Sequence, residues 1–268
     1  MTAFTTLSVE RDGAIVHVQL QRPEKLNAQT HEMWAELRQL RRELGQDTTI
    51  RALILSGAGR SFSAGLDTAV LSNFMGASVP DDVAGLTGTD LVIAIQQSFT
   101  WLNEAPYPTI AAVQGHALGA GCQLALACDL RIAADNAVFA LPETNWGLMP
   151  DLGGTVWLPQ LVGPAVAKEL MWLADRVDAT EAHRLGLVNR VVPVDDLLTT
   201  ARALADRLAT RPPLAVTAVK RAVQAGLTDQ DAGLLEAGVG QLRCLASSDL
   251  VEAGTAFLEQ RQPVYTGT

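Results

Sequence analysis

The stretch PTIAAVQGHALGAGCQLALACDLRIA, from Pro108 to Ala133, decides the fold class of this chain. Its apolar run Thr109 to Val113 is short and bounded by turn residues, which predicts a strand buried on both faces. A glycine-rich turn, Gly115 to Gly121, follows, and the run CQLALAC is helical in character up to Asp129. Leu130 to Ala133 has the pattern of another strand. This succession of strand, turn, helix and strand predicts an α/β fold.

A second stretch of the same design lies earlier in the chain. Ala52 to Ser56 (ALILS) is predicted to be a buried strand, and the glycine-containing turn GAGRSFSAGLD, Gly57 to Asp67, follows it. Ala14 to Leu20 alternates apolar and polar residues, as a half-buried strand does. From Thr30, which is placed to cap a helix, apolar residues recur every three or four positions until Gly45. The chain therefore alternates strands and helices from its first quarter.

The other segments divide into a loop region and a helical C-terminal quarter. Thr68 to Leu91 lacks periodicity and contains several glycines and a proline, so we expect a mobile loop with a partial helix that shapes a pocket. Helical spacing starts at Leu197, and Pro212-Pro213 starts a further helical segment. We therefore expect a core over residues 1–195 and a helical segment over residues 196–268.

Composition limits the classes of function. The chain has 268 residues, of which 48% are apolar and 18% are charged. This number of apolar residues is sufficient for one large core. A net charge of -9 and a pI near 4.9 argue against a nucleic-acid partner or an anionic membrane partner, because both need clustered Lys and Arg. The N-terminus has no basic stretch followed by an apolar run, so we expect a cytoplasmic protein.

Cysteine and histidine usage indicates neither a disulfide framework nor a metal site. The three cysteines have no CxxC spacing, and we expect Cys122 and Cys128 to be buried packing residues. The four histidines are scattered without metal-ligand spacing. No Ser-His-Asp or Cys-His set can be assembled from the pattern.

The two glycine-containing turns can hold a negative oxygen. Backbone N–H groups at such turns lack helix partners, so two turns side by side provide a pair of donors, which is the outline of an oxyanion hole. The alternative is that the glycines only permit tight packing. A phosphate loop is excluded, because the first turn has no GK[ST] and the second lacks the GxGxxG spacing.

The order of these segments resembles the crotonase family over nearly the whole chain. The resemblance is carried by RPEKLNA (Arg22 to Ala28), GAGRSFSAGLD, the stretch Pro108 to Ala133 and FALPETNWGLMPDLGGTVWLPQLVG (Phe139 to Gly163). It implies a spiral of ββα units, C-terminal helices that build homotrimers or homohexamers, and acyl-CoA as substrate. It also implies oxyanion donors at the N–H groups of Leu66 and of Ala120, where the family usually has glycine.

The carboxylates separate the reactions known in this family. Its hydratases use two glutamates, and the matching positions here are Gln123 and Glu143. Glutamine cannot exchange a proton at neutral pH, whereas Glu143 alone could move a proton from C2 of a 3-enoyl thioester to C4. Asp151 resembles the second acid of the family's dienoyl-CoA isomerases, which also carry an acid at the Gln123 position.

Each of these side chains also has a structural interpretation. Glu143 could be a solvated turn residue, and Asp151 could cap the helix that follows it. Asp67 is expected to satisfy backbone groups, and Lys220 and Arg221 are expected to be exposed. Trp146 and Met149 could line the acyl tunnel or equally occupy core positions. His116 is expected to be a packing residue. Together with the resemblance, these interpretations give the predicted substrate-binding set Lys25, Ala28, Ala64, Gly65, Leu66, Asp67, Ala120, Gln123 and Trp146.

The sequence therefore predicts an enoyl-CoA isomerase with Glu143, Asp151 and the N–H groups of Leu66 and Ala120 as catalytic groups. No metal or redox cofactor is expected, since coenzyme A enters as part of the substrate. The alternatives are an enoyl-CoA hydratase, in which Gln123 only orients water, and a non-catalytic acyl-CoA binding protein.

Overall fold

The structure is a computed structural model that describes residues 4–72 and 81–268. Its main element is a six-stranded sheet in the order β1-β2-β3-β4-β6-β9. The first two strands pair antiparallel, and every later pair is parallel. The strands are β1 Leu7–Asp12, β2 Ile15–Leu20, β3 Ala52–Gly57, β4 Thr109–Val113, β6 Leu130–Ala134 and β9 Arg190–Val192.

A second, three-stranded sheet gives the fold its spiral character. It consists of β5 His116–Leu118, β7 Val138–Ala140 and β8 Val177–Asp178. The chain passes from β4 to β5 and then into helix α4 Ala120–Leu126, and it passes from β6 to β7 and then toward helix α5 Gly154–Val162. In both of these turns the chain thus places one strand in each sheet before a helix. This arrangement confirms the predicted α/β spiral of ββα units.

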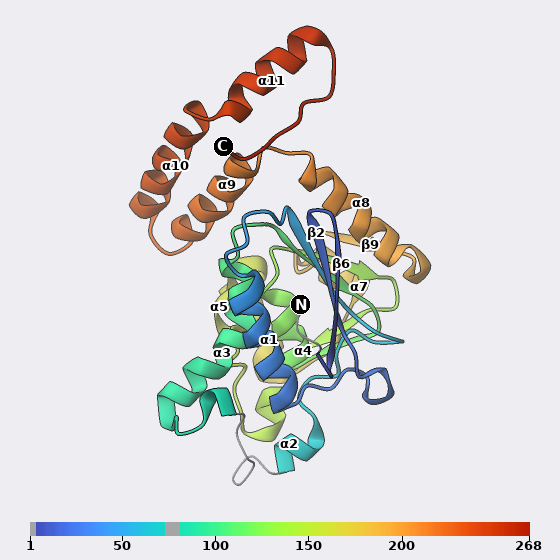
Figure 1. Ribbon diagram of the computed structural model, residues 1–268. Coiled ribbons are helices and arrows are strands. Elements are labelled where there is room, and N and C mark those ends of the chain that lie inside the picture. The colour runs from blue at the N-terminus through green and yellow to red at the C-terminus, as the bar shows by residue number, and fades with distance from the viewer. Residues whose placement is uncertain (1–3, 73–80) are drawn as a thin grey trace.

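Both faces of the six-stranded sheet are covered by apolar side chains. On one face, residues such as Val18, Leu53 and Val113 pack with helices α1 His31–Leu44 and α3 Gly88–Glu104. On the other face, Ile54, Ile110 and their neighbours pack with α8 Leu197–Ala209. Figure 1 shows α8 on the opposite side of the sheet from α1 and α3. Two-sided burial explains why β3 and β4 are continuous apolar runs.

The predicted first helix is confirmed together with its cap. Thr30 Oγ1 accepts a hydrogen bond from Met33 N at 3.2 Å, and the helix ends at Gly45. The prediction for Thr68 to Leu91 is wrong at its end, because α3 begins at Gly88. Helix α2 covers Thr68–Ser72, and residues 73–80 of the expected loop lie outside the described residues.

The C-terminal helices after α8 extend away from the sheet, as Figure 1 shows. They are α9 Pro213–Gly226, α10 Gln230–Leu245 and α11 Ser248–Glu259. Because α8 fills a face of the sheet, the projecting part begins at α9, after the boundary predicted at residue 196. The remaining helices are α6 Pro164–Leu173 and α7 Ala179–Arg184, with short 3-10 turns η1 Pro23–Lys25, η2 Asp81–Val83, η3 Pro142–Trp146 and η4 Val194–Asp196. None of the described helices is long and apolar enough to cross a bilayer.

Lys220 corrects a prediction, because its side chain is buried rather than exposed. Only 8% of the side chain is accessible, and Nζ donates to Asp129 Oδ2 at 2.8 Å. It also donates to the carbonyl oxygens of Leu102 and Tyr107. The apolar stem of Lys220 packs against the core, and its ammonium group donates to three acceptor oxygens, which makes burial of the charge tolerable. Lys220 thus ties α9 to the core, whereas Arg221 is exposed as predicted.

Candidate active site

The two glycine-containing turns lie side by side. Phe62 N donates to Gln114 O at 2.7 Å, and Ser63 N donates to His116 O at 2.8 Å. Leu118 N returns a bond to Ser63 O at 3.0 Å. These bonds continue the pairing of β3 with β4 beyond the ends of both strands. The turns that the sequence placed after two buried strands therefore meet at one edge of the sheet.

Close approach of the two turns explains why position 65 is glycine. Gly65 has a φ of +91°, and a Cβ there would lie 2.6 Å from Leu118 O. The same Cβ would lie 3.6 Å from Ala120 N. A side chain at this position would therefore be strained and would push the turns apart. The first turn thus sits directly against the start of α4.

The N–H groups of Leu66 and Ala120 are the two predicted oxyanion donors. Around Leu66, the backbone pairing with Gln29 uses Gly65 O and Asp67 N, so Leu66 N does not take part. Ala120 is the first residue of α4, where a helical N–H has no intrahelical acceptor. Within the described chain neither N–H has a hydrogen-bond acceptor. Two free donors on adjoining turns can hold one developing oxyanion.

Glu143 places a carboxylate next to the second turn. It lies on η3, and a Cβ added to Gly119 would lie 3.3 Å from Glu143 Oε1. Glu143 Oε2 is buried without a hydrogen-bond partner in the described chain. Burial raises the pKa of Glu143 to about 6, and the nearby charge of Asp151 adds to the effect. A carboxylate with this pKa can both accept and return a proton near neutral pH.

Gln123 is buried and is bonded on both sides of its amide. Nε2 donates to Glu143 Oε1 at 2.7 Å, and Oε1 accepts from Gly154 N at 3.0 Å. Because Gly154 N–H can only donate, it fixes which end of the amide faces Glu143. Gly154 was not among the predicted site residues, although the Gly153-Gly154 pair opening α5 was a visible signal. The amide therefore orients one carboxylate oxygen and supplies no exchangeable proton.

Asp151 lies half-buried between η3 and α5, and burial raises the pKa of its carboxylate. The N-cap residue of α5 is Gly153, and no side chain caps that helix. The structural interpretation of Asp151 as a helix cap is therefore wrong. Its backbone oxygen accepts from Gln96 Nε2 at 2.7 Å, which anchors the segment to α3.

The segment RPEKLNA lies against the first turn. Ala64 N donates to Leu26 O at 2.9 Å, which brings Ala28 and the exposed Lys25 beside this turn. Asp67 accepts from Ala69 N and pairs with Arg22 at 3.0 Å. The bond from Ala69 N is the main cause that lowers the pKa of Asp67, and Arg22 adds to it. Asp67 therefore satisfies a backbone group and an arginine of this segment, as predicted, and its place in the substrate-binding set stays a prediction.

Other predicted residues have clear positions. Trp146 and Met149 are 67% and 59% exposed, which excludes a core position for both. Cys122 and Cys128 are buried, as predicted. His116 Nδ1 lies 3.2 Å from Ser61 Oγ, and His116 is a packing residue between the turns. Among the described residues, no group of three or more His, Cys, Asp or Glu could hold a metal ion.

Known proteins resemble the chain over nearly its full length. A family profile described as enoyl-CoA hydratase/isomerase matches residues 10–268. The crotonyl-CoA hydratase of Syntrophomonas wolfei is 38% identical over 263 residues, covering 97% of this chain and 97% of that protein. The chain is therefore similar to enzymes of this family, and the name of the Syntrophomonas wolfei protein describes the addition of water to crotonyl-CoA.

Solved structures agree with the sequence comparisons. The crystal structure of an enoyl-CoA hydratase from Bacillus anthracis has a TM-score of 0.88 at 34% identity, covering 98% of this chain and 100% of that chain. A structure from Thermobifida fusca YX has a TM-score of 0.81 at 36% identity, covering 90% of this chain and 95% of that chain, and is a complex with acetoacetyl-CoA. The names of these relatives describe hydration and do not describe a double-bond shift.

Proposed function

Because the chain belongs to the enoyl-CoA hydratase/isomerase family, we propose that it is an enoyl-CoA isomerase, which moves a double bond of an acyl-CoA thioester. The observation that carries this proposal is the amide of Gln123 bonded to Glu143 Oε1. Water activation between two carboxylates is not available when one of the two positions is an amide. A proton shift along the acyl chain needs only one base.

In the proposed reaction, Glu143 removes a proton from C2 of a 3-enoyl thioester. The electron pair of the broken C–H bond moves toward the thioester carbonyl and forms a dienolate. The N–H groups of Leu66 and Ala120 stabilise its oxygen, and each such donor contributes about 3 kcal/mol in related chemistry. Glu143 then returns the proton at C4, which leaves the double bond between C2 and C3. No metal or redox cofactor takes part in this sequence.

Glu143 Oε2 is the oxygen that we assign to proton transfer. Oε1 is held by Gln123, whereas Oε2 is buried and has no partner in the described chain. A buried carboxylate oxygen without a donor is costly, and such a group is expected at a functional site. The thioester would bring the C2 proton to this oxygen.

Hydration is the second candidate reaction, and the names of the relatives favour it. In this reading Gln123 helps Glu143 orient a water molecule, and Glu143 is the only proton carrier. A non-catalytic acyl-CoA binding protein is the third possibility. The raised pKa of Glu143 argues against it, because an acid poised near neutral pH has no use in simple binding.

Initial rates on matched substrates test the proposal. Purified protein is given 3-enoyl-CoA and 2-enoyl-CoA of the same chain length, and products are separated by chromatography. We expect conversion of the 3-enoyl substrate to exceed hydration of the 2-enoyl substrate. Faster hydration would assign the protein to the hydratases, and saturable binding without either product would assign it to the binding proteins.

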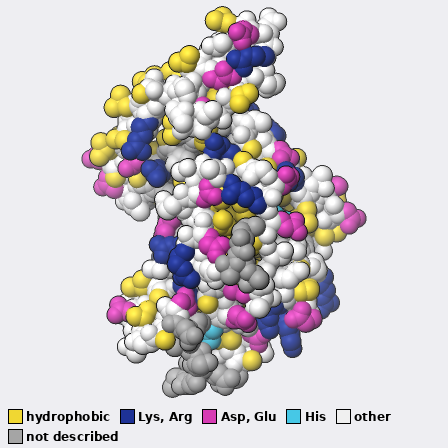
Figure 2. Space-filling view, viewed as in Figure 1, with side chains coloured by type: hydrophobic (Ala, Val, Ile, Leu, Met, Phe, Trp, Pro, Cys, Tyr) yellow, Lys and Arg dark blue, Asp and Glu magenta, His cyan; other side chains and the backbone are white. Residues whose placement is uncertain are grey.

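The assembly that we propose is a homotrimer or a pair of trimers, built through the C-terminal helices. Figure 2 shows hydrophobic side chains along the outer edge of this projecting part. On α10 four leucines are between 56% and 69% exposed, which is unusual for a free surface. They are Leu234, Leu235, Leu242 and Leu245. An apolar row of this kind is typical of an obligate interface.

A further inference from the structure

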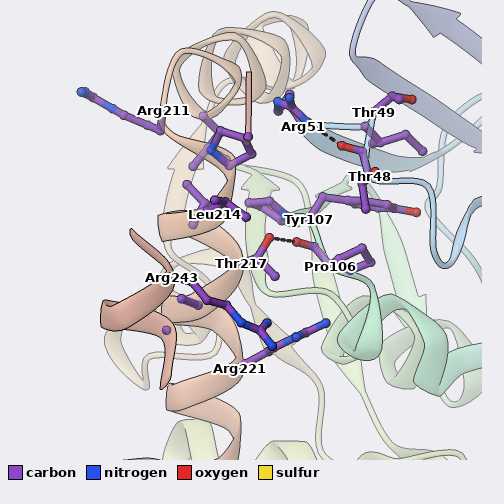
Figure 3. A pocket seen from close by; sticks show the side chains of 18 of the residues that line it. Thr48, Thr49, Arg51, Pro106, Tyr107, Arg211, Leu214, Thr217, Arg221 and Arg243 are labelled. Carbon is purple, nitrogen blue, oxygen red and sulfur yellow. Dashed lines mark hydrogen bonds between the residues drawn. The ribbon is translucent and has the colours of Figure 1, made fainter. Parts of the chain in front are cut away.

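A cavity of about 500 Å³ lies between the core and the C-terminal helices, away from Glu143. Its walls come from the segment before β3, the segment before β4, α9, α10 and the last residues of the chain. Figure 3 shows this cavity from close by. A volume of this size falls within the range of about 300–1,000 Å³ that small-molecule sites occupy.

The cavity and the candidate active site lie at opposite ends of the same two strands. Arg51 and Pro108 line the cavity and directly precede β3 and β4, whereas the two turns follow the carboxyl ends of these strands. A strand of six residues spans roughly 20 Å. A ligand in the cavity would therefore not compete directly with an acyl-CoA held at the turns.

Two arginines from neighbouring helices converge in the cavity. Figure 3 shows the side chains of Arg221 on α9 and Arg243 on α10 at the same end of the cavity. Neither guanidinium forms a hydrogen bond or an ion pair with any residue of the described chain. Like charges that converge repel each other, and an oxyanion between them would receive charge-assisted hydrogen bonds from both. This pair is therefore poised for an anion.

The other charged side chains that line the cavity are two further arginines and one glutamate. Arg51 is already bonded to Thr48 O at 2.6 Å and to Thr266 O at 3.3 Å. Arg211 points out of the cavity in Figure 3. Glu236 also lines the cavity, so the charged side chains of the lining are four arginines and one glutamate, an excess of positive charge that favours an anion.

The wall beside the arginine pair is apolar. Leu214 and Tyr107 lie between Arg51 and the pair in Figure 3, and Pro106 and Val239 also line the cavity. The hydroxyl of Tyr107 is engaged with Leu44 O at 2.9 Å, so its ring rather than its polar end is available as a surface. A ligand here would place an apolar body against this wall.

We propose that this cavity binds an aliphatic monocarboxylate, with its carboxylate between Arg221 and Arg243 and its chain along Leu214 and Tyr107. Such a ligand would bridge the core and the C-terminal helices without occupying the candidate active site. The proposal does not depend on which reaction the protein catalyses, since it rests on the cavity and its lining alone.

Calorimetric titration of the full-length protein with hexanoate, octanoate and decanoate tests the apolar part. We expect affinity to rise by about fourfold for each added methylene that the cavity buries. Inorganic phosphate, which has no apolar body, is expected to bind more weakly than decanoate. Affinity that does not change with chain length, or phosphate binding that exceeds decanoate binding, would overturn the assignment of an aliphatic ligand.

Charge substitutions test the arginine pair. Arg221→Gln and Arg243→Gln should each weaken decanoate binding by about tenfold, and Arg211→Gln is the matched control, with an effect of less than about twofold. All three side chains are exposed, so unfolding temperatures should stay close to wild type. Equal affinity in all four proteins would place the fatty acid elsewhere. If Arg221→Gln and Arg243→Gln instead dissociate the oligomer while wild type binds no decanoate, the pair belongs to a subunit interface and the proposal fails.

Discussion

The side-chain amide of Gln123 donates to Glu143 Oε1 at 2.7 Å, and this bond orients a carboxylate that lies against Gly119 of the second turn. The amide is itself fixed by Gly154 N, so three elements hold the orientation of one oxygen. The second oxygen, Oε2, stays free for chemistry. The amide of Gln123 thus supports one oxygen of the Glu143 carboxylate and leaves the other without a partner in the described chain.

Glu143→Gln should remove most of the activity while coenzyme A binding stays within about threefold of wild type. The amide has the same shape but cannot accept the C2 proton, and a general base contributes about 10²–10⁴ in rate. Steady-state rates with 3-enoyl-CoA and calorimetric binding of coenzyme A measure the two effects. Glu181→Gln, at an exposed ion pair on α7, is the control. Near wild-type turnover in Glu143→Gln would exclude Glu143 as the base.

Activity should rise as pH increases through about 6, because Glu143 must be ionised to accept a proton and its pKa is raised to about 6. The bond from Gln123 favours the ionised form, so Gln123→Met should move this rise to higher pH. The pH profile of kcat/KM checks both statements. Gln39→Met, on the surface of α1, should leave the profile unchanged. A loss of rate in Gln123→Met without a shifted profile would mean that Gln123 only packs.

Glu143→Gln should also stabilise the protein at pH 8. The folded-state pKa of Glu143 is about 6 against 4.5 for an ordinary glutamate, so the folded state holds the proton more tightly than the unfolded chain. Stability therefore falls as pH rises from 4.5 to 6, and the full cost of about 2 kcal/mol is present above this window. The gain in the variant should vanish near pH 4. Chemical unfolding at both pH values measures it, and a variant less stable than wild type at pH 8 contradicts the argument.

Most of the fold could be predicted because its local signals agree with its tertiary contacts. The buried runs at β3 and β4 and the capped helix α1 were visible in the sequence for this reason. Helix α3 was missed, because it begins at a glycine and Thr87 makes no side-chain cap bond. Its position depends instead on distant contacts, such as Arg38 Nη1 donating to Ser98 Oγ at 2.8 Å.

The sequence predicted which residues belong to the candidate site, but it did not predict the hydrogen bonds between them. The motifs identified Glu143 and the two turns, yet the sequence did not reveal that Gln123 is bonded to Glu143 and to Gly154. Lys220 was predicted to be exposed because its partner Asp129 lies 91 residues away in the chain. Polar partners brought together only by folding give no periodic signal, and for this reason both features required the structure.

The apolar row on α10 should hold subunits together. Leu235→Asp combined with Leu242→Asp introduces two charges on one face of the helix, where both leucines are 69% exposed. We expect wild type to have the mass of a trimer or hexamer and the variant to have the mass of a monomer, as measured by light scattering at micromolar concentration. Val194→Asp, at an exposed apolar residue outside these helices, should leave the mass unchanged. A monomeric wild type would contradict the proposed assembly.

Asp151 supplies the last prediction, which concerns the length of the proton path. Burial is the main cause of the raised pKa of Glu143 and the charge of Asp151 adds to it, and we propose that both acids act on one substrate. A 1,3 shift can be served by Glu143 alone, moving between C2 and C4. A 1,5 shift in a 3,5-dienoyl thioester has its ends too far apart for one side chain, so a second acid beside the far carbon is needed.

Asp151→Asn should therefore slow the 3,5-dienoyl reaction by about 10²-fold or more and the 3-enoyl reaction by less than about tenfold. The asparagine keeps the shape of the side chain and cannot carry the proton. The bond from Gln96 goes to the Asp151 backbone oxygen, so the substitution leaves the anchor to α3 in place. Gln96→Ala is the matched control for a displaced loop, and it should lower both rates together. Initial rates on 2-enoyl, 3-enoyl and 3,5-dienoyl thioesters of equal length decide the matter. Equal losses of Asp151→Asn on all three substrates would make Asp151 a structural residue, because only a proton carrier beside the far carbon distinguishes the longer path from the shorter one.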